Sequence, residues 1–436
     1  MKRSSMGRGG KRQEKSREAR RTAAEVKQTS RTTTQSGSSL RPAVEKFECF
    51  AITAPGLEPI AAEELRALNV NAVAELGGVA WTGSASTLAL ANLWLRTASR
   101  VVVRAAEFNA RTFRELERHA RQIPWERFVA AGAPVTLRVT CKKSKLYHSG
   151  AVEQRLLASI EHRLGATPVN VKEEQAKAKT GGDDSHEEPA EGASGAQLFV
   201  VRVAHDKVTV SADSSGELLH RRGYRLATAK APLRETLGAA LLLAAGWKGS
   251  TPLVDPMCGS GTLCIEAALI ARRMAPGANR SFAFLNWPDA DVAAWQRLVE
   301  RAVAEQLARS PVGIIGSDRD EGAVIAAKAN AERAGVAADI EWATRPVSAL
   351  ECPAGTRGLI VTNPPYGVRV GEADALRNLY AQLGNVARAK CPGWNLALLS
   401  ADARLDKQVG LAFEERFKTS NGGIPVRAIV APVASV

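Results

Sequence analysis

The residues whose types and spacing could do chemistry are Asn363, Pro364, Pro365 and Tyr366, which follow a short apolar run. Each proline fixes φ and removes a backbone donor, so the amide of Asn363 and the ring of Tyr366 should point in defined directions. The Asn363 side-chain oxygen and the Pro364 carbonyl can accept both hydrogens of a planar amino group, and Tyr366 offers a face for stacking. The pattern indicates a clamp for a flipped-out nucleobase. The alternative is a double-proline loop that only caps a strand.

A glycine-rich turn lies earlier in the chain, from Asp255 to Thr262, and reads Asp-Pro-Met-Cys-Gly-Ser-Gly-Thr. An apolar strand should end at Asp255, and a helix is predicted from Leu263 to Met274. The glycines would let the backbone approach a ligand closely, and the helix N-terminus adds a favourable dipole. One Gly-x-Gly alone is a weak signal, so the strands that follow decide its interpretation.

Further strands are predicted at 312–318, 340–342, 359–361 and 394–399, with helical stretches between them. This alternation predicts a Rossmann-like, doubly wound α/β sheet that binds ligands at the carboxyl ends of its strands. An extra amphipathic helix is predicted within residues 289–310.

Asp318 closes one of these strands, where a carboxylate can accept both hydroxyls of a ribose. The alternative is that Asp318 caps the helix predicted near Glu321, but Asp320 is better placed to do so. Asp255 and Asp318 are 63 residues apart, far beyond the roughly 20 of a dinucleotide-binding fingerprint. A nicotinamide-dependent enzyme is therefore disfavoured.

The first half of the chain predicts two smaller mixed units of strands and helices. Their strands are expected at 47–53, 77–83, 100–103, 135–140, 198–203 and 207–212. One helix is expected to begin near residue 58, and two others are expected at 86–95 and 151–164. The last two strands should form a hairpin that turns at His205 and Asp206.

The net charge of the 436 residues is +14, and it is concentrated at the N-terminus. The first 46 residues hold 13 lysines or arginines, four glutamates and almost no large apolar side chain. This composition predicts a disordered tail that binds a polyanion, with a transit peptide or a tail without function as alternatives. Lys142, Lys143 and Lys145 form a second basic cluster that could contact RNA, although locally a solvated surface is slightly favoured.

No apolar run approaches the roughly 20 residues needed to span a bilayer, which predicts a soluble, cytoplasmic protein. The cysteines include no Cys-x-x-Cys pair and no histidine partner at metal spacing, which predicts reduced thiols and no metal site. The six are Cys49, Cys141, Cys258, Cys264, Cys352 and Cys391.

In combination, these motifs resemble those of S-adenosylmethionine-dependent amino-group methyltransferases. His-Arg-Arg-Gly-Tyr-Arg at 220–225 and Ala-Pro-Leu-Arg-Glu-Thr-Leu at 231–237 narrow the resemblance. From Phe47 onward the chain is similar to the THUMP-containing RNA methyltransferases, in particular the 23S ribosomal RNA guanine-N2-methyltransferase module of the RlmL type. The resemblance implies methylation of N2 of a guanine in RNA, with large-subunit ribosomal RNA as the partner.

After the disordered basic tail (1–46), which composition predicts, the resemblance implies three parts. They are a ferredoxin-like subdomain (47–98), a THUMP domain (99–214) and a methyltransferase domain (215–436). Composition also predicts a flexible, mostly acidic insertion at 172–197, within the THUMP part.

The resemblance also implies a role for each matching residue. The target base would be bound by Asn363, Pro364 and Tyr366. The cofactor, S-adenosylmethionine, would be bound by Asp255, Pro256, Cys258, Gly259, Gly261, Thr262 and Asp318. The RNA would be contacted by Lys142, Lys143, Lys145, Arg221, Arg222 and Arg225.

One residue departs from the family pattern. Pro346 occupies the position where an Asp commonly accepts a hydrogen bond from the adenine amine of the cofactor. A lost hydrogen bond of about 0.5 to 1.5 kcal/mol would weaken the affinity for the cofactor by roughly ten-fold, unless Ser348 or a backbone carbonyl substitutes.

Two alternative functions stay open. One is methylation of an amine in adenine or in a protein glutamine, and the other is a cofactor-free role in RNA binding or ribosome assembly.

Overall fold

The computed structural model describes most of the chain beyond residue 45. The described residues are 1, 46–165, 169–170, 195–225, 233–353, 355–366 and 373–434. Contacts separate residues 1–45 from residues 46–436, and the described helices and strands all belong to 46–436. The tail predicted over 1–46 and the insertion predicted over 172–197 therefore lie almost wholly outside the described residues.

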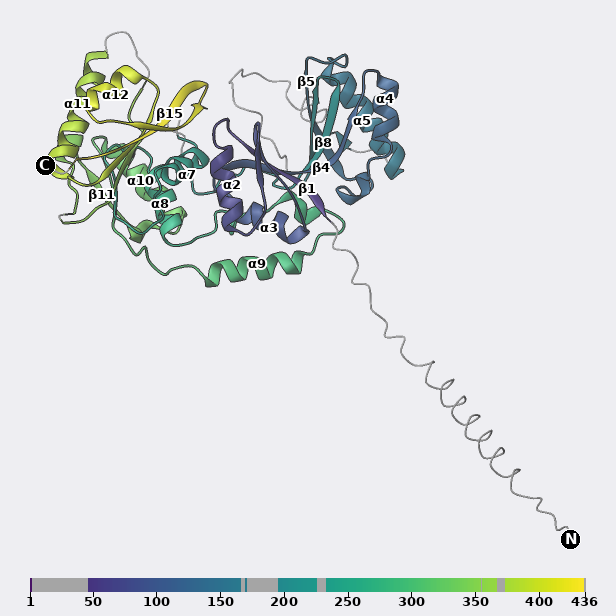
Figure 1. The fold of residues 1–436 in the computed structure, drawn as a ribbon, viewed down its shortest axis with the longest axis horizontal. Helices are drawn as coiled ribbons and strands as arrows, with labels where there is room; N and C mark the ends of the chain where they lie inside the picture. Colours follow the sequence, from purple (N-terminus) through teal and green to yellow (C-terminus); the bar gives the residue numbers. More distant parts are fainter. Residues whose placement is uncertain are drawn as a thin grey trace. The chain divides into compact units, whose positions relative to one another are not determined.

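The first half of the described chain builds one sheet of eight strands in the order β2-β3-β1-β4-β8-β7-β5-β6. The strands are β1 (Phe47–Thr53), β2 (Val73–Glu75), β3 (Gly78–Gly83), β4 (Ala98–Asn109), β5 (Pro134–Lys142), β6 (Val169–Asn170), β7 (Gln197–Ala204) and β8 (Lys207–Asp213). The helices that pack on the sheet are α2 (Glu58–Ala67), α3 (Ala85–Trp94), α4 (Phe113–Ala120) and α5 (Ser149–Leu164). They contribute to a single hydrophobic core, and Figure 1 shows α4 and α5 side by side next to β5 and β8.

Strand β4 joins the two predicted units into one continuous sheet. Its residues 98–103 pair with β1, and its residues 102–109 pair with β8. The sequence predicted only four residues of this twelve-residue strand, because its second part alternates with exposed polar side chains such as Glu107. The predicted hairpin between β7 and β8 is confirmed, since His205 and Asp206 form its turn with positive φ angles.

The second half builds a seven-stranded sheet in the order β11-β10-β9-β12-β13-β15-β14. The strands are β9 (Leu253–Asp255), β10 (Ile314–Asp318), β11 (Ile340–Thr344), β12 (Leu359–Thr362), β13 (Asn395–Ser400), β14 (Glu414–Asn421) and β15 (Ile424–Pro432). The first five in the spatial order are parallel, and β15 is antiparallel to both of its neighbours. The predicted doubly wound sheet is confirmed. The antiparallel β14–β15 hairpin was not predicted.

Helices cover both faces of this sheet (Figure 1). Those on one face are α7 (Glu235–Ala244), α8 (Thr262–Ala271) and α10 (Glu321–Arg333), and those on the other are α11 (Ala373–Lys390) and α12 (Ala403–Val409). The strand order reverses at β9, so the carboxyl ends of β9, β10 and β12 open towards the crevice in which doubly wound folds bind ligands. No helix in the described part of the chain is long and apolar enough to cross a membrane.

A segment inserted between α8 and β10 ties the two sheets together. It contains the helix α9 (Val292–Ala304), which confirms the extra amphipathic helix predicted within 289–310. Phe282, Trp287 and Trp295 of this segment are buried in the core of the first sheet, although they belong in sequence to the second. The Trp287 ring lies 5.1 Å from the Phe128 ring, and its Nε1 donates to the Gln197 side chain at 2.8 Å.

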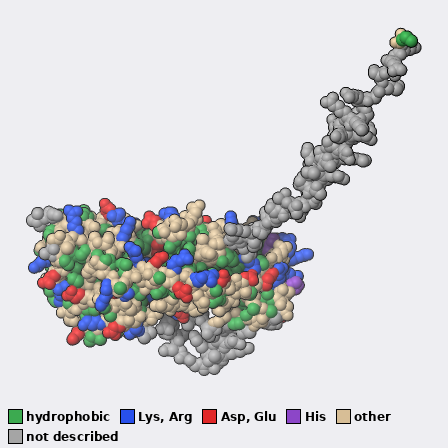
Figure 2. Space-filling model, turned by 90° about the horizontal axis from the view of Figure 1, so that it is seen from below, with side chains coloured by type: hydrophobic (Ala, Val, Ile, Leu, Met, Phe, Trp, Pro, Cys, Tyr) green, Lys and Arg blue, Asp and Glu red, His purple; other side chains and the backbone are tan. Residues whose placement is uncertain are grey.

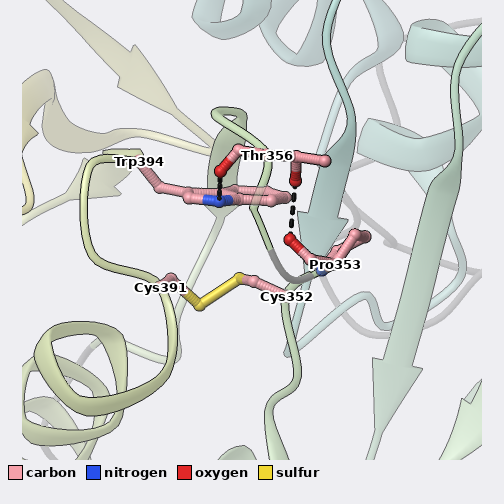
Figure 3. Close-up of a disulfide and its surroundings, with 5 residues drawn as sticks. All are labelled: Cys352, Pro353, Thr356, Cys391 and Trp394. Carbon is pink, nitrogen blue, oxygen red and sulfur yellow. Dashed lines mark hydrogen bonds between the residues drawn. A yellow bond between two sulfur atoms is a disulfide. The ribbon is translucent and has the colours of Figure 1, made fainter.

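One prediction from the cysteines is wrong. Cys352 and Cys391 form a disulfide, with their Cα atoms 5.5 Å apart (Figure 3). The two cysteines are 39 residues apart in sequence, and only the fold brings the segment after β11 next to the end of α11. Near the disulfide, the Trp394 indole donates to the Thr356 carbonyl at 2.9 Å. The other four cysteines are free thiols.

Replacing Phe282 with Ala should lower the free energy of unfolding by about 3 to 5 kcal/mol, because its buried ring would leave a cavity between the two halves. Urea denaturation followed by tryptophan fluorescence measures the loss. The matched control is Val303→Ala in α9, where the side chain is 49% exposed, and it should change stability by less than about 0.5 kcal/mol. Equal stability of the two variants would contradict the shared core.

Candidate active site

The glycine-rich turn lies between the end of β9 and the start of α8. Gly261 has a φ of +87°, and a Cβ atom there would lie 2.8 Å from the Trp342 ring and 2.9 Å from the Cβ of Ala327. A larger residue at Gly261 would therefore displace β11 or α10. Gly259 also has a positive φ, but no described atom lies within 4 Å of a Cβ built there. The turn thus packs tightly at its second glycine and leaves open space at its first.

The end of β10 holds this turn in place. The Gly259 amide donates to Oδ2 of Asp318 at 3.0 Å, and the Cys258 amide donates to the Ser317 carbonyl at 2.9 Å. The other Asp318 oxygen accepts from the Asp320 amide at 3.0 Å. Each carboxylate oxygen has two acceptor positions, so Asp318 can still accept hydroxyl groups from a ligand.

Asp320 provides the N-cap of α10, because its carboxylate accepts from the Gly322 amide at 2.8 Å. This confirms the cap predicted from the sequence.

Asp255 is the buried acid of the site. It ends β9, is 1% exposed, and accepts from the Met257 amide at 3.1 Å. Burial raises the pKa of Asp255 to about 7, and the negative charge of Asp318 contributes in the same direction. A cationic ligand group beside this carboxylate would favour its ionised form.

The other predicted cofactor residues of this turn are buried. Pro256 and Cys258 lie in the turn itself, and burial raises the pKa of the Cys258 thiol, which stays neutral. The Thr262 hydroxyl accepts from the guanidinium of Arg225 at 2.7 Å. The buried side chains of these three residues therefore support the conformation of the turn.

The Asn-Pro-Pro-Tyr turn follows β12, whose four residues are all buried. Pro364 is buried, Pro365 is exposed and Tyr366 is half-buried. Oδ1 of Asn363 is buried and has no hydrogen-bond partner among the described residues. An unpaired buried acceptor costs about 1 to 3 kcal/mol, so this oxygen is available to a ligand that donates a hydrogen bond.

The Tyr366 hydroxyl accepts a hydrogen bond from Nδ2 of Asn421 at 2.7 Å. Asn421 is the last residue of β14 and lies 55 residues from Tyr366 in sequence. Sequence reasoning missed this residue. The one available signal was the Asn421-Gly422-Gly423 sequence, which is typical of a tight hairpin turn.

Pro346 lies just after β11, and its side chain is exposed. The Arg345 amide donates to the Asp318 carbonyl at 2.9 Å, so this segment lies next to the end of β10. Ser348 is also exposed. The predicted loss of an adenine contact at Pro346 stays a prediction.

The predicted RNA contacts fall into two groups. Lys142, Lys143 and Lys145 are exposed at the end of β5. The Lys145 amide donates to Asp206 at 2.7 Å, and Arg111, which is 75% exposed, forms an ion pair with the same carboxylate at 3.0 Å. Arg111 therefore joins this basic cluster, although the sequence alone did not suggest it. On the face shown in Figure 2, cations and anions are interspersed, so charge alone outlines no RNA footprint there.

The second group lies at the junction of the two halves. Arg221 is exposed, but the Arg222 side chain is only 3% exposed and donates to the Arg96 carbonyl at 2.6 Å. Arg225 forms an ion pair with Glu235 at 3.3 Å and holds Thr262. The placement of Arg222 and Arg225 does not support direct contact with RNA. It gives them a structural role beside the glycine-rich turn.

The site as a whole suits an organic ligand with a cationic end and a ribose. Asp255 offers a buried carboxylate, Asp318 offers acceptors, and no described atom crowds the position of a Cβ on Gly259. In the described part of the chain, no group of three or more His, Cys, Asp or Glu side chains is arranged to hold a metal ion.

Two protein families match the chain. Residues 222–428 match the RMKL-like methyltransferase domain, and residues 48–102 match the RlmL ferredoxin-like domain. A putative RNA methyltransferase of Synechocystis sp. is 35% identical over 378 residues, which cover 86% of this chain and 94% of that protein. The ribosomal RNA large subunit methyltransferase K/L of Syntrophotalea carbinolica is 37% identical over 404 residues. That match covers 88% of this chain but only 53% of the relative, so the chain spans about half the length of this relative.

Two solved structures share the fold. A putative methyltransferase complexed with SAH is 29% identical, with a TM-score of 0.76 over 90% of this chain and 99% of that one. A predicted N6-adenine-specific DNA methylase from Listeria monocytogenes is 32% identical, with a TM-score of 0.76 over 90% of this chain and 97% of that one.

Replacing Asp255 with Asn should flatten the pH dependence of stability. Because the folded-state pKa is raised to about 7, the native protein binds a proton more tightly than the unfolded chain does, and stability falls as pH rises from about 4 to about 7. The contribution of one proton is at most about 1.4 kcal/mol per pH unit. Urea denaturation of the ligand-free protein across this range measures the slope, and Asp320→Asn is the control. An unchanged slope in Asp255→Asn would contradict the raised pKa.

Proposed function

This chain belongs to the RlmL-like family of RNA methyltransferases, and from this premise we propose that it methylates N2 of a guanine in large-subunit ribosomal RNA. Its cofactor is S-adenosylmethionine, which supplies an electrophilic methyl group on a sulfonium. Asp255 and the glycine-rich turn would hold the methionine end, and Asp318 would hold the ribose. These assignments are supported by the buried carboxylate of Asp255 and by the acceptor positions left on Asp318.

The observation that carries the proposal is the buried Oδ1 of Asn363, which has no hydrogen-bond partner within the described parts of the chain. This oxygen lies at the carboxyl end of β12, which is the strand next to β9 and the glycine-rich turn. A planar exocyclic amine has two hydrogens to donate, and the Pro364 carbonyl offers the second acceptor. The side chain of Asn363 is uncharged at any physiological pH, so it can accept a hydrogen bond from a neutral amine without a change in its own protonation.

The clamp would act on the amine by holding its geometry. The lone pair of an exocyclic amine is delocalised into the base, which makes the nitrogen a weak nucleophile. Accepting both hydrogens favours a pyramidal nitrogen and directs its lone pair along one line. Tyr366 would stack on the base, which is worth roughly 1 to 3 kcal/mol and helps to offset the cost of flipping it out. No charged general base is needed, because the nitrogen becomes acidic once it is methylated.

Guanine N2 is the finer part of the proposal. The same clamp fits the amine of adenine, and the Listeria relative is described as a predicted N6-adenine-specific DNA methylase. RNA is favoured over DNA or protein because both putative and ribosomal RNA methyltransferases match most of this chain. An rRNA substrate also implies a cytoplasmic location.

We further propose that residues 99–214 present the RNA to the site, as a THUMP domain would. The exposed cluster of Lys142, Lys143, Lys145 and Arg111 at one end of the first sheet supports this role. The limits of 47–98 for the ferredoxin-like part and 215–436 for the methyltransferase part belong to the same proposal.

Replacing Asn363 with Ala should lower the rate of methyl transfer by about 100-fold or more, because the amine loses an acceptor that is oriented for the transition state. RNA binding should change little, since Asn363 contributes no charge. The measurement is transfer of labelled methyl groups to rRNA from cells that lack this protein, with RNA affinity measured in parallel. Asn395→Ala is the matched control, because Asn395 is exposed at the opposite end of the neighbouring strand β13. Undiminished methylation by Asn363→Ala would overturn the proposed clamp.

Replacing Lys142, Lys143 and Lys145 together with Ala should weaken RNA binding and its dependence on salt. The logarithm of the affinity falls as the logarithm of the salt concentration rises. Each lost phosphate contact makes this slope less steep by about 0.7 to 0.9, so the slope of the triple variant should be less steep by about two. Fluorescence anisotropy with an rRNA fragment over a salt series measures this slope. The control replaces three exposed lysines of the second half, which are Lys328, Lys390 and Lys407. Equal slopes for the two triple variants would rule out a specific role for the first cluster.

A further inference from the structure

Tyr366 is bound through its hydroxyl by a residue that belongs to a different part of the fold. Nδ2 of Asn421 donates to this hydroxyl at 2.7 Å from the end of β14. We propose that Asn421 is a positioning residue for methyl transfer, which fixes the direction of the Tyr366 side chain and so the place of the ring against which the target base stacks. This inference rests on the proposed function, because it assigns Asn421 a role in the same site.

The backbone of the turn does not fix the ring by itself. Pro364 and Pro365 restrict the path of the chain, but the side chain of Tyr366 can still rotate about its Cα–Cβ and Cβ–Cγ bonds. The ring is half-buried and packs against the core of the second sheet. A hydrogen bond at the far end of the side chain holds the hydroxyl in one place, which restrains rotation about the Cα–Cβ bond and so fixes where the ring lies.

The chemistry of the hydroxyl agrees with a positioning role. Burial raises the pKa of Tyr366, so the phenol is neutral at physiological pH even though the bond from Asn421 acts in the opposite direction. A neutral phenol with a raised pKa is a poor base for a proton from the amine. The hydroxyl is therefore suited to hold the ring rather than to accept a proton.

The position of Asn421 is itself well defined. β14 and β15 are joined by Gly422 and Gly423, which have φ angles of +56° and +82°, and Asn421 pairs with Ile424 across the turn. Two consecutive residues with positive φ form the two-residue turn that matches the twist of a hairpin. Asn421 is thus fixed by the strand register at the tip of the hairpin.

The first half of the chain braces the same strand. A Cβ atom on Gly56, in the turn between β1 and α2, would lie only 2.1 Å from the carbonyl oxygen of Lys418 in β14. Gly56 has a φ of +86°, and the next residue, Leu57, is buried in the core of the second sheet. The turn at Gly56 therefore packs directly against the backbone of the strand that carries Asn421.

The test is a double-mutant cycle with Asn421→Ala and Tyr366→Phe in the full chain. Each single variant removes one partner of the hydrogen bond and should lower the single-turnover rate of methyl transfer by roughly three- to ten-fold. The double variant should be no slower than the slower single variant, because both changes remove the same interaction. The substrate is rRNA from cells that lack this protein. Binding of S-adenosylhomocysteine, measured by calorimetry, should be unchanged in all variants.

Ser420→Ala is the matched control, because Ser420 is exposed and neighbours Asn421 on the same strand. It should transfer methyl groups at the wild-type rate. Tyr366→Phe leaves the hairpin untouched, so it tests the proposal even where Asn421→Ala perturbs folding. Wild-type rates in Tyr366→Phe, or losses that multiply in the double variant, would overturn the positioning role. Absence of transfer by the wild-type protein would instead overturn the proposed function.

Discussion

The packing of three aromatic side chains across the junction of the two halves is the interaction on which the rest of the structure depends. Phe282, Trp287 and Trp295 lie in the second half of the sequence but complete the core of the first sheet. Because a segment of the second half completes the core of the first sheet, the two halves cannot rotate independently without exposing these rings to water. The exposed lysines at the end of β5 and the Asn-Pro-Pro-Tyr turn after β12 therefore belong to parts of the chain that are packed together. Under the proposed function, that rigidity determines which part of an RNA reaches the clamp.

Buried charge strengthens the same junction. Arg222 lies against Glu266 at 3.4 Å, and both side chains are almost fully buried. Ions in such a place are tolerated only when they are paired, and removing one partner is strongly destabilising. Because Glu266 belongs to α8, which begins at the glycine-rich turn, this pair also fixes the helix that supports the cofactor site. Arg225 adds a direct bond to Thr262 at the start of that helix.

The sequence was most informative where local pattern and local structure coincide. The unbroken apolar run before Asn363 predicted β12 and the turn after it, and the spacing of Asp318 and Asp320 correctly separated a strand end from a helix cap. It failed where a residue's role depends on a distant partner. In the sequence, Arg222 and Arg225 resemble cations that could contact RNA. In the fold, both side chains donate hydrogen bonds to acceptors within the protein. Asn421 and the Cys352–Cys391 disulfide become visible only when strands and helices far apart in sequence are brought together.

The close approach of Gly56 to Lys418 has a consequence for how such a protein can evolve. A side chain at position 56 would collide with a backbone oxygen, which cannot move without shifting the whole hairpin. The methyltransferase part can therefore not be recombined with an arbitrary N-terminal domain. A new partner would have to present a turn equally free of side chains at the same point on β14. Shuffling of these two parts is therefore constrained by steric fit at one glycine.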